Sequence, residues 1–301
     1  MPIRQFFHLM QIVDDHDLAE ARYAALLAPQ VFQPKGWSDF DKRWASLAVI
    51  GPDFVLEIME PSTAEADRNA PLPKFHARHG QHWHSMSWFV DPAEDLVALG
   101  RRMADRGCRV IDPYPPGLAG RGDAPLTLFT HPKDTFGQLE FQALTDHSRR
   151  DPHLGADWTG SFWRDEHPLA IERCSHITTA VSDLERARSF YEEVLDAPAF
   201  HDEQSGDRRS AFVMVGTETV VELAQPIGTD SRLGRDLAAH GEVPHSVTFT
   251  VADLGAVANH AADISVRVAD QDDETILLEP EDLCGALVGF TTRRLPGDPR
   301  G

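Results

Sequence analysis

Two glutamates stand inside apolar, strand-like runs of the sequence, where a charged side chain needs a partner. Glu57 lies in the run FVLEIM and Glu140 lies in QLEF. Burial of an unpaired carboxylate is costly, so each of these acids requires a metal ion, an arginine or a proton. Arg43 is a candidate partner for Glu57. A carboxylate held in this way is suited to binding a metal ion or to moving a proton.

Histidines accompany these acids at matching positions of an internal repeat. When the chain is aligned with itself, three positions carry the same residue type in both halves: His8 and His176, Glu57 and Glu222, and His84 and His245. At a fourth position Glu140 is matched by Val288, which cannot bind a metal. The repeat comprises blocks that occur in the same order in each half: 6–27 with 173–195, 43–61 with 208–226, 84–90 with 245–251, and 132–141 with 280–290. Matched blocks in one order make chance similarity improbable.

Each half has the pattern of strands and helices needed to place these side chains. A short strand leads into a helix, as where Asp183 precedes apolar residues at helical spacing, and β-branched runs broken by glycine follow. The pattern then recurs within the half, with a predicted helix at 93–107 ended by Gly107 and a shorter one at 253–263. We therefore predict an α+β fold of four βαβββ units. The predicted domains are 1–145 and 173–295, joined by a polar linker, 146–172, whose aromatic residues make ordered contacts.

The composition of the chain indicates which classes of binding partner are expected. The chain has 301 residues and a formal net charge of −20, which disfavours a polyanion such as nucleic acid. Its three cysteines are scattered, so neither a disulfide framework nor a thiolate zinc site is expected. No apolar run approaches the ~20 residues of a membrane span, and the N-terminus is predicted to be a first strand rather than a signal peptide. We expect a cytoplasmic protein that is a monomer or a homodimer. Its expected partner is a small-molecule substrate, which could be an anion.

Two stretches of the second half resemble the vicinal oxygen chelate superfamily, which includes glyoxalase I, methylmalonyl-CoA epimerase and extradiol dioxygenases. They are SHITTAVSDLERARSFYEEVL (175–195) and VVELAQPIGTDSRLGRDLAAHGEVPHSVTFTVADL (220–254). The resemblance covers nearly the whole chain apart from the linker, and it is specific for fold but weak for reaction. It implies two glyoxalase-like halves, in which each pair of units forms an open barrel-like cup around one divalent metal ion. That ion would be Zn, Ni, Co, Fe or Mn, which accept imidazole and carboxylate ligands.

The resemblance also implies which residues hold the ion. Carried onto this chain, the complete set is His8, Glu57, His84 and Glu140, with Glu57 or Glu140 as the catalytic base. The second, degenerate set is His176, Glu222 and His245, with Val288 in place of a carboxylate. Some relatives pair units from different halves. The complete set would then be His176, Glu222, His84 and Glu140, and the broken set would be His8, Glu57, His245 and Val288.

Strand register leaves the orientation of His84 and His245 open. The other two histidines of the sets lie five residues before the valine that ends their strand, whereas these two lie six residues before it. Simple alternation therefore turns both rings toward the helix-packed face and places Ser85 and Ser246 in the cup. A β-bulge would return the histidines to the cup.

Three classes of function are compatible with these residues. The first is a metal-dependent isomerase, epimerase or lyase that transfers a proton beside a carbonyl group of a small chelating substrate. The second is a ring-cleaving dioxygenase with His8, His84 and Glu140 as its iron ligands. The third is a metal-free binding protein with an apolar pocket, whose candidate lining residues, otherwise plain core, are Trp44, Trp83, Trp88 and Phe89.

A further group of histidines lies between the two units of the first half. His76 and His79 precede the run GQHWH at 80–84. A metal-binding tract is one interpretation of this group, but we expect a solvent-exposed loop.

Overall fold

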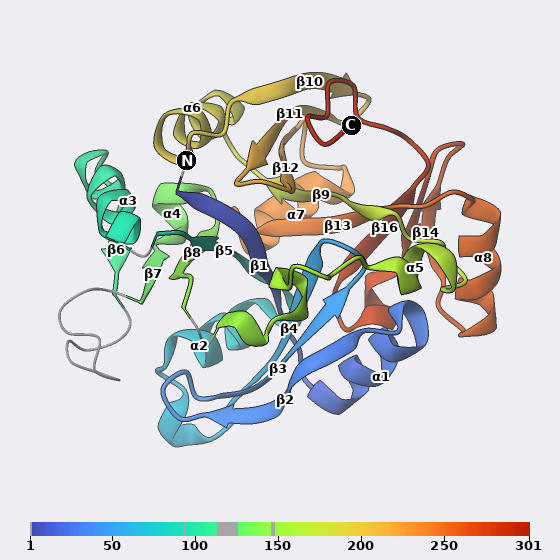
Figure 1. The fold of residues 1–301 in the computed structure, drawn as a ribbon, viewed down its shortest axis with the longest axis horizontal. Coiled ribbons are helices and arrows are strands. Elements are labelled where there is room, and N and C mark those ends of the chain that lie inside the picture. Colours follow the sequence, from blue (N-terminus) through green and yellow to red (C-terminus); the bar gives the residue numbers. More distant parts are fainter. Residues whose placement is uncertain (1, 93, 113–125, 146–147) are drawn as a thin grey trace.

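The structure, a computed structural model, describes residues 2–92, 94–112, 126–145 and 148–301. Its strands form two eight-stranded sheets, one from each half of the repeat (Figure 1). Within each sheet two βαβββ units lie side by side, and the first strands of the two units are neighbours at the centre. The predicted α+β fold of tandem glyoxalase-like halves is confirmed, and the sheets are open rather than closed into barrels.

The same strand order occurs in both sheets. In the first sheet it is β2-β3-β4-β1-β5-β8-β7-β6, and in the second it is β10-β11-β12-β9-β13-β16-β15-β14. The first sheet contains β1 (Ile3–Ile12), β2 (Gln30–Ser38), β3 (Arg43–Ile50), β4 (Phe54–Pro61), β5 (His82–Val90), β6 (Val110–Ile111), β7 (Thr127–Thr130) and β8 (Gln138–Ala143). The second contains β9 (Arg173–Ala180), β10 (Ala199–Ser205), β11 (Arg208–Val215), β12 (Thr219–Pro226), β13 (Pro244–Thr250), β14 (Val268–Gln271), β15 (Thr275–Leu278) and β16 (Leu287–Thr291). Units therefore pair within each half, as β1 with β5 and β9 with β13, and not across the halves.

Each unit carries one longer helix after its first strand, and aspartates begin three of these helices. The side chains of Asp15, Asp183 and Asp253 accept hydrogen bonds from backbone N–H groups of the first turn. The unit helices are α1 (His16–Leu27), α3 (Glu94–Asp105), α6 (Leu184–Leu195) and α8 (Leu254–Asp263). The remaining helices are α2 (Pro71–His79), α4 (Pro132–Thr135), α5 (Ser161–Asp165) and α7 (Arg232–His240), with short 3₁₀ turns η1 (Glu65–Asp67), η3 (Ser148–Arg150), η4 (Pro152–Leu154) and η5 (Pro280–Leu283).

One of these helices corrects the sequence prediction. The segment with His76 and His79, expected to be a loop, is the helix α2, which begins with a proline and ends before Gly80. The matching helix α7 of the second half is capped by the side chain of Ser231. Both helices lead directly into the first strand of a second unit, so their side chains lie close to the sheet junction.

The two halves share one hydrophobic core rather than packing as separate bodies. The rings of Phe54 and Phe249, one from each half, meet edge to face with centroids 5.3 Å apart. The backbone also approaches closely: Gly216 has a φ of +69°, and a Cβ there would lie 1.9 Å from the carbonyl oxygen of Arg4. Around the sheets, α3 packs against α6, and the ring of His260 in α8 lies 3.1 Å from a carbonyl oxygen at the end of α1 (Figure 1).

The segment between the halves is ordered against the first half. The indole nitrogens of Trp158 and Trp163 donate hydrogen bonds to the carbonyl oxygens of Pro52 and Leu27, at 2.7 and 2.8 Å. The aromatic contacts predicted for the linker are therefore present, although its first two residues, 146 and 147, lie outside the described residues. The domain limits at 145 and 173 stay a prediction, because one core runs through both sheets. None of the described helices is long and apolar enough to cross a membrane.

Candidate active site

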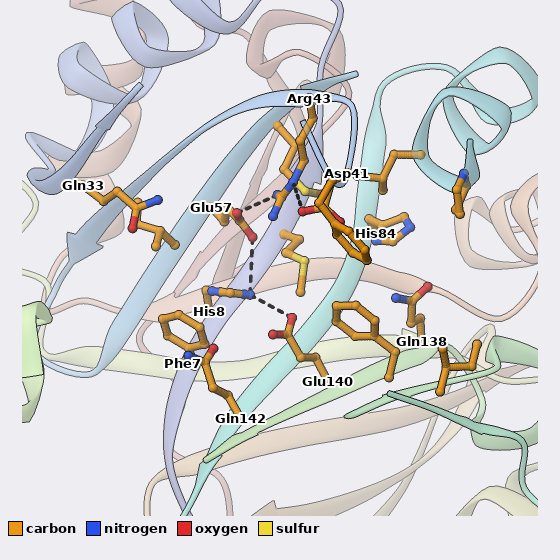
Figure 2. A pocket seen from close by; sticks show the side chains of 18 of the residues that line it. Phe7, His8, Gln33, Asp41, Arg43, Glu57, His84, Gln138, Glu140 and Gln142 are labelled. Carbon is orange, nitrogen blue, oxygen red and sulfur yellow. Dashed lines mark hydrogen bonds and ion pairs between the residues drawn. The ribbon is translucent and has the colours of Figure 1, made fainter. Parts of the chain in front are cut away.

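A cavity of about 820 Å³ lies against the first sheet and is lined almost entirely by the first half of the chain (Figure 2). Its apolar lining includes Phe7, Met10, Phe32, Phe40, Met59 and Phe129. Its polar lining includes Gln33, His131, Gln138, Gln142, Arg150 and Asp151. A mostly apolar cavity of this size with a few convergent polar groups is typical of a small-molecule site.

His8, Glu57 and Glu140 come together at this cavity because four adjacent strands, β4, β1, β5 and β8, hold them in register. On β1, Leu9 points into the core, so its neighbour His8 points to the opposite face. Residue Ser87 of β5 links His8 on one side with Glu140 of β8 on the other, since it is paired with both. Glu57 of β4 is paired with Met10, which lies two residues after His8 on β1.

The three side chains are buried and incompletely satisfied. Nε2 of His8 lies 3.4 Å from Oε2 of Glu57 and 3.4 Å from Oε2 of Glu140. Oε1 of Glu57 accepts a hydrogen bond of 2.6 Å from Nη1 of Arg43, which confirms the arginine partner suggested by the sequence. Oε2 of Glu57 and Nδ1 of His8 have no hydrogen-bond partner among the described residues. Buried polar atoms without partners point to a missing ligand or ion.

This donor set fits a divalent metal ion in its chemistry, with one adjustment. A separation of 3.4 Å is long for a hydrogen bond. It matches the roughly 3.4 Å between two ligand atoms that bind one tetrahedral zinc. However, these three residues are not among the described groups whose ligand atoms all lie within 4.8 Å of one another. One carboxylate must rotate toward the other to hold an ion, and Glu140 is the one that no arginine holds among the described residues.

The β-bulge that would turn His84 toward the cup is present. Along β1 and β5 the pairing moves from Met10 with Ser85 to Gln11 with Trp83, which leaves His84 as the extra residue. His84 then lines the cavity, and its Nδ1 lies 2.7 Å from Oγ of Ser85. No hydrogen bond or ion pair joins its ring to the other three proposed ligands in the part of the chain that the structure describes, and Figure 2 draws it apart from them. Its role as a ligand stays a prediction.

In the second cup, the matching histidine and glutamate have protein partners. His176 Nε2 lies 3.6 Å from Oε2 of Glu222, but that acid is already satisfied by Arg208 and by the hydroxyl groups of Ser210 and Thr178, which donate to it at 2.6 Å each. The ring of Phe212 packs edge to face on His176, with centroids 5.6 Å apart. Val288 is fully buried and supplies no ligand. His245 sits in an equivalent bulge and pairs with Asp236 instead of Glu222.

Acid pH is expected to destabilise the protein through its buried histidines. Burial lowers the pKa of His84 to about 3 and that of His176 to about 4. Between about pH 4 and pH 6.5 the unfolded chain therefore binds protons that the native chain does not, so stability falls as pH falls, by at most about 1.4 kcal/mol per pH unit for each ring. Asp53 and Asp151, whose pKa burial raises to about 6, oppose this trend.

Urea unfolding of the chelator-treated protein, followed over this pH range, measures the effect. His176→Gln should make the fall in unfolding free energy shallower than in the wild type. An unchanged slope would contradict the assignment of His176 as a neutral buried ring.

Several lining residues were not predicted, and the four candidate aromatics do not belong to the pocket. Gln138 and Gln142 flank Glu140 at two residues on either side, so strand alternation could have placed them on the same face. The four aromatics proposed for an apolar pocket do not line the cavity: Trp83, Trp88 and Phe89 are buried core, and Trp44 is 40% exposed beside Trp37. Trp88 packs on Phe6 and Phe141 on the opposite face of the sheet, which is the plain-core alternative.

Comparison with known proteins points to one group. The family described as the glyoxalase/bleomycin resistance protein/dioxygenase superfamily matches residues 175–276. Mitochondrial methylmalonyl-CoA epimerase of Homo sapiens is 28% identical over 139 residues, which are 43% of this chain and 76% of that protein. The uncharacterized protein YqjC of Bacillus subtilis (strain 168) is 30% identical over 103 residues, covering 34% of this chain and 73% of that protein.

A solved structure matches the chain along its whole length. It is a triple mutant of 4-hydroxymandelate synthase from Streptomyces coelicolor, with a TM-score of 0.68 over 98% of this chain and 95% of that one. The two sequences are 16% identical, so this likeness bears on the fold alone.

Proposed function

The chain belongs to the glyoxalase/bleomycin resistance protein/dioxygenase superfamily, also called the vicinal oxygen chelate superfamily, and from this premise we propose that its first-half cup is a metal-dependent active site. The proposed reaction is proton transfer beside a carbonyl group of a small chelating substrate, as in an isomerase, epimerase or lyase. The observation that carries this proposal is the buried group of His8, Glu57 and Glu140, with an unbonded carboxylate oxygen facing the ring. The superfamily includes metal-dependent epimerases and dioxygenases, and its members typically bind a divalent metal.

In this proposal, the two glutamates have different roles because they have different partners. His8 Nε2 and Glu57 Oε2 would hold the ion, and Arg43 fixes the Glu57 carboxylate in place through its other oxygen. A bound divalent ion would stabilise the negative charge that develops on the substrate oxygen. Glu140 has no ion pair with an arginine among the described residues and reaches the same point from β8, so it would accept the proton from the substrate carbon and return it.

The cavity wall suggests how the substrate would be held. Gln138 and Gln142 lie on either side of Glu140 and present amide groups to substrate oxygens. Arg150, exposed and lining the same cavity, would meet an acidic group of the substrate. The aromatic lining keeps water away from the carbon that loses the proton. A small carbonyl compound with an acidic substituent is therefore the proposed substrate class.

The ring-cleaving dioxygenase alternative requires His84 as a second histidine ligand. In the structure His84 bonds to Ser85 and packs edge to face on Phe75, with ring centroids 4.7 Å apart. The ring of His8 is thus flanked by two carboxylates rather than by a second imidazole. This arrangement favours proton transfer over the two-histidine, one-carboxylate chemistry of iron oxygenases.

Solvent deuterium exchange tests the proposal directly. Protein loaded separately with Zn, Ni, Co, Fe(II) or Mn would be mixed in D₂O with 2-oxo acids, hydroxy ketones and branched acyl thioesters, and the C–H signals followed by NMR. We expect exchange next to the carbonyl with at least one metal and none after chelation. Oxygen uptake with catechols but no exchange would instead support the dioxygenase. Tight binding of a ligand without either reaction would support the metal-free binding protein.

A further inference from the structure

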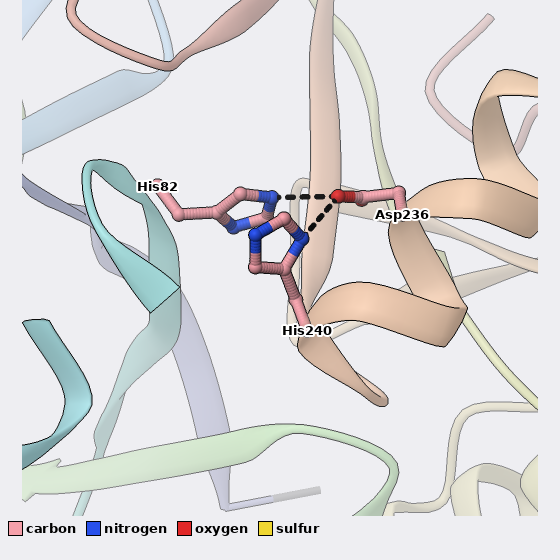
Figure 3. Close-up of side chains that lie close together, drawn as sticks. All are labelled: His82, Asp236 and His240. Carbon is pink, nitrogen blue, oxygen red and sulfur yellow. Dashed lines mark hydrogen bonds and ion pairs between the residues drawn. The ribbon is translucent and has the colours of Figure 1, made fainter. Parts of the chain in front are cut away.

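Three histidines surround the carboxylate of Asp236 at the junction between the halves. Figure 3 shows two of them, His82 and His240. Oδ1 of Asp236 lies 2.9 Å from Nε2 of His82 and 2.7 Å from Nδ1 of His240. Oδ2 lies 2.5 Å from Nδ1 of His245. His82 begins β5 of the first half, whereas the other three residues belong to α7 and β13 of the second half. The group is thus assembled only when the halves pack together.

Local structure aims these side chains at one point. Asp236 and His240 are four residues apart on α7, so they share one face of the helix. The bulge in β13 frees His245 from the regular alternation and turns its ring toward that face. The rings of His82 and His240 lie with their centroids 4.1 Å apart and their planes tilted by 32°, on the same side of the carboxylate.

The hydrogen bonds of His82 leave its lone pair facing the acid. Nδ1 of His82 lies 2.8 Å from the carbonyl oxygen of Trp83, so this nitrogen must donate a proton. In a neutral ring Nε2 then carries the lone pair, and it points at Oδ1 of Asp236. Two lone pairs at this distance repel unless a cation or an additional proton lies between them. A second proton on His82 would place a positively charged ring next to the ring of His240, with the centroids 4.1 Å apart.

The carboxylate itself stays ionised. Burial alone would favour the neutral acid, but hydrogen bonds from His240 and His245 outweigh it and hold the pKa of Asp236 well below its ordinary value. The site therefore offers one anionic oxygen and two imidazole nitrogens, which is a donor set that divalent transition metals prefer.

We propose that His82, Asp236 and His240 bind a divalent transition-metal ion, of the zinc, cobalt or nickel type, that joins the two halves of the chain. Their ligand atoms all lie within 4.8 Å of one another. The ligand atoms of a tetrahedral zinc lie about 3.4 Å apart. Side-chain movements of roughly half an ångström would therefore separate the three ligand atoms enough to admit an ion. The side chains of Asp236 and His240 are 11% and 21% exposed, which gives an ion a path from solvent.

Two further histidines would support the ion. His245 would donate its Nδ1–H to the carboxylate oxygen that does not bind the metal and so hold the acid in place. Nδ1 of His79 is buried without a hydrogen-bond partner among the described residues, and its ring lies 5.6 Å from that of His240. His79 is therefore the candidate fourth ligand. This site goes beyond the proposed function, because none of its residues lines the cavity of the first cup.

Cobalt titration tests the site separately from the cup. Chelator-treated His8→Gln protein, in which the cup has lost one ligand, would be titrated with Co²⁺ while visible absorption and the unfolding midpoint are recorded. We expect one equivalent to bind, to produce the ligand-field bands of cobalt bound to imidazole, and to raise the unfolding midpoint. Adding His240→Gln or Asp236→Asn should weaken Co²⁺ binding at least about tenfold. Adding His260→Gln, a histidine on α8 outside both sites, should leave binding unchanged.

Other outcomes are decisive as well. His8→Gln protein that shows neither cobalt bands nor a shift in unfolding midpoint would overturn the proposal. So would equal Co²⁺ affinity with and without His240→Gln or Asp236→Asn, each checked for folding by thermal unfolding in chelator. The proposed function stands or falls independently, because it is judged by exchange in protein that keeps His8.

Discussion

Replacing Glu140 by glutamine is expected to slow proton exchange between substrate and solvent by roughly 10²–10⁴-fold, the usual contribution of a general base. The substitution keeps the shape of the side chain and removes the oxygen charge that lies 3.4 Å from Nε2 of His8. The fold should persist, because Glu140 is 7% exposed and no arginine among the described residues depends on it. The measurement is the loss of the substrate C–H signal in D₂O at saturating substrate and metal.

Metal content separates the two ways in which Glu140 could act. If it serves only as the base, Glu140→Gln protein keeps its metal and loses the exchange. If it also binds the ion, both are lost together. Glu185→Gln, an exposed substitution on α6, is the matched control and should change neither. Exchange at the wild-type rate in Glu140→Gln protein would remove Glu140 from the reaction.

The cup residues could be predicted from the sequence because they obey two simple rules. His8 and Glu57 recur in the repeat, and all three cup residues are polar residues in apolar strands, whose alternation allows only one face for them. The structure brings His8, Glu57 and Glu140 together as these rules predict. The same reasoning also predicted that a buried Glu57 needs a partner, and Arg43 provides one.

Other features could not be predicted because they depend on backbone irregularity or on contacts between distant segments. Alternation alone turned His84 away from the cup, and only the paired strands reveal the bulge that returns it. The packing of the two halves determines the surroundings of His82, which meets Asp236 across 154 positions of the chain. The apolar side chain of Trp88 would suit a pocket as well as a core. Only the face of the sheet on which it lies shows that it belongs to the core.

Removing Arg43 should test whether an arginine or a metal is the main partner of Glu57. The Arg43 and Glu57 side chains are 16% and 4% exposed, and their closest atoms are 2.6 Å apart. Arg43→Met leaves a buried carboxylate without its cation, so we expect a loss of about 3–5 kcal/mol in the unfolding free energy of metal-free protein. The double variant Arg43→Met, Glu57→Met should recover most of that loss, because it removes both charges and keeps apolar volume.

The second half of the repeat provides a control variant, and comparing metal-free with metal-loaded protein distinguishes the arginine from the metal as the partner of Glu57. Arg208→Met removes the matching arginine of the second cup, but Glu222 keeps the hydroxyl groups of Ser210 and Thr178, so a smaller loss is expected there. If the ion binds Glu57, loading with metal should reduce the loss caused by Arg43→Met, since a second cation then faces the acid. Metal should not change the effect of Arg208→Met. Equal losses for Arg43→Met with and without metal, measured by urea unfolding, would show that Glu57 is held by the arginine alone and is not a ligand.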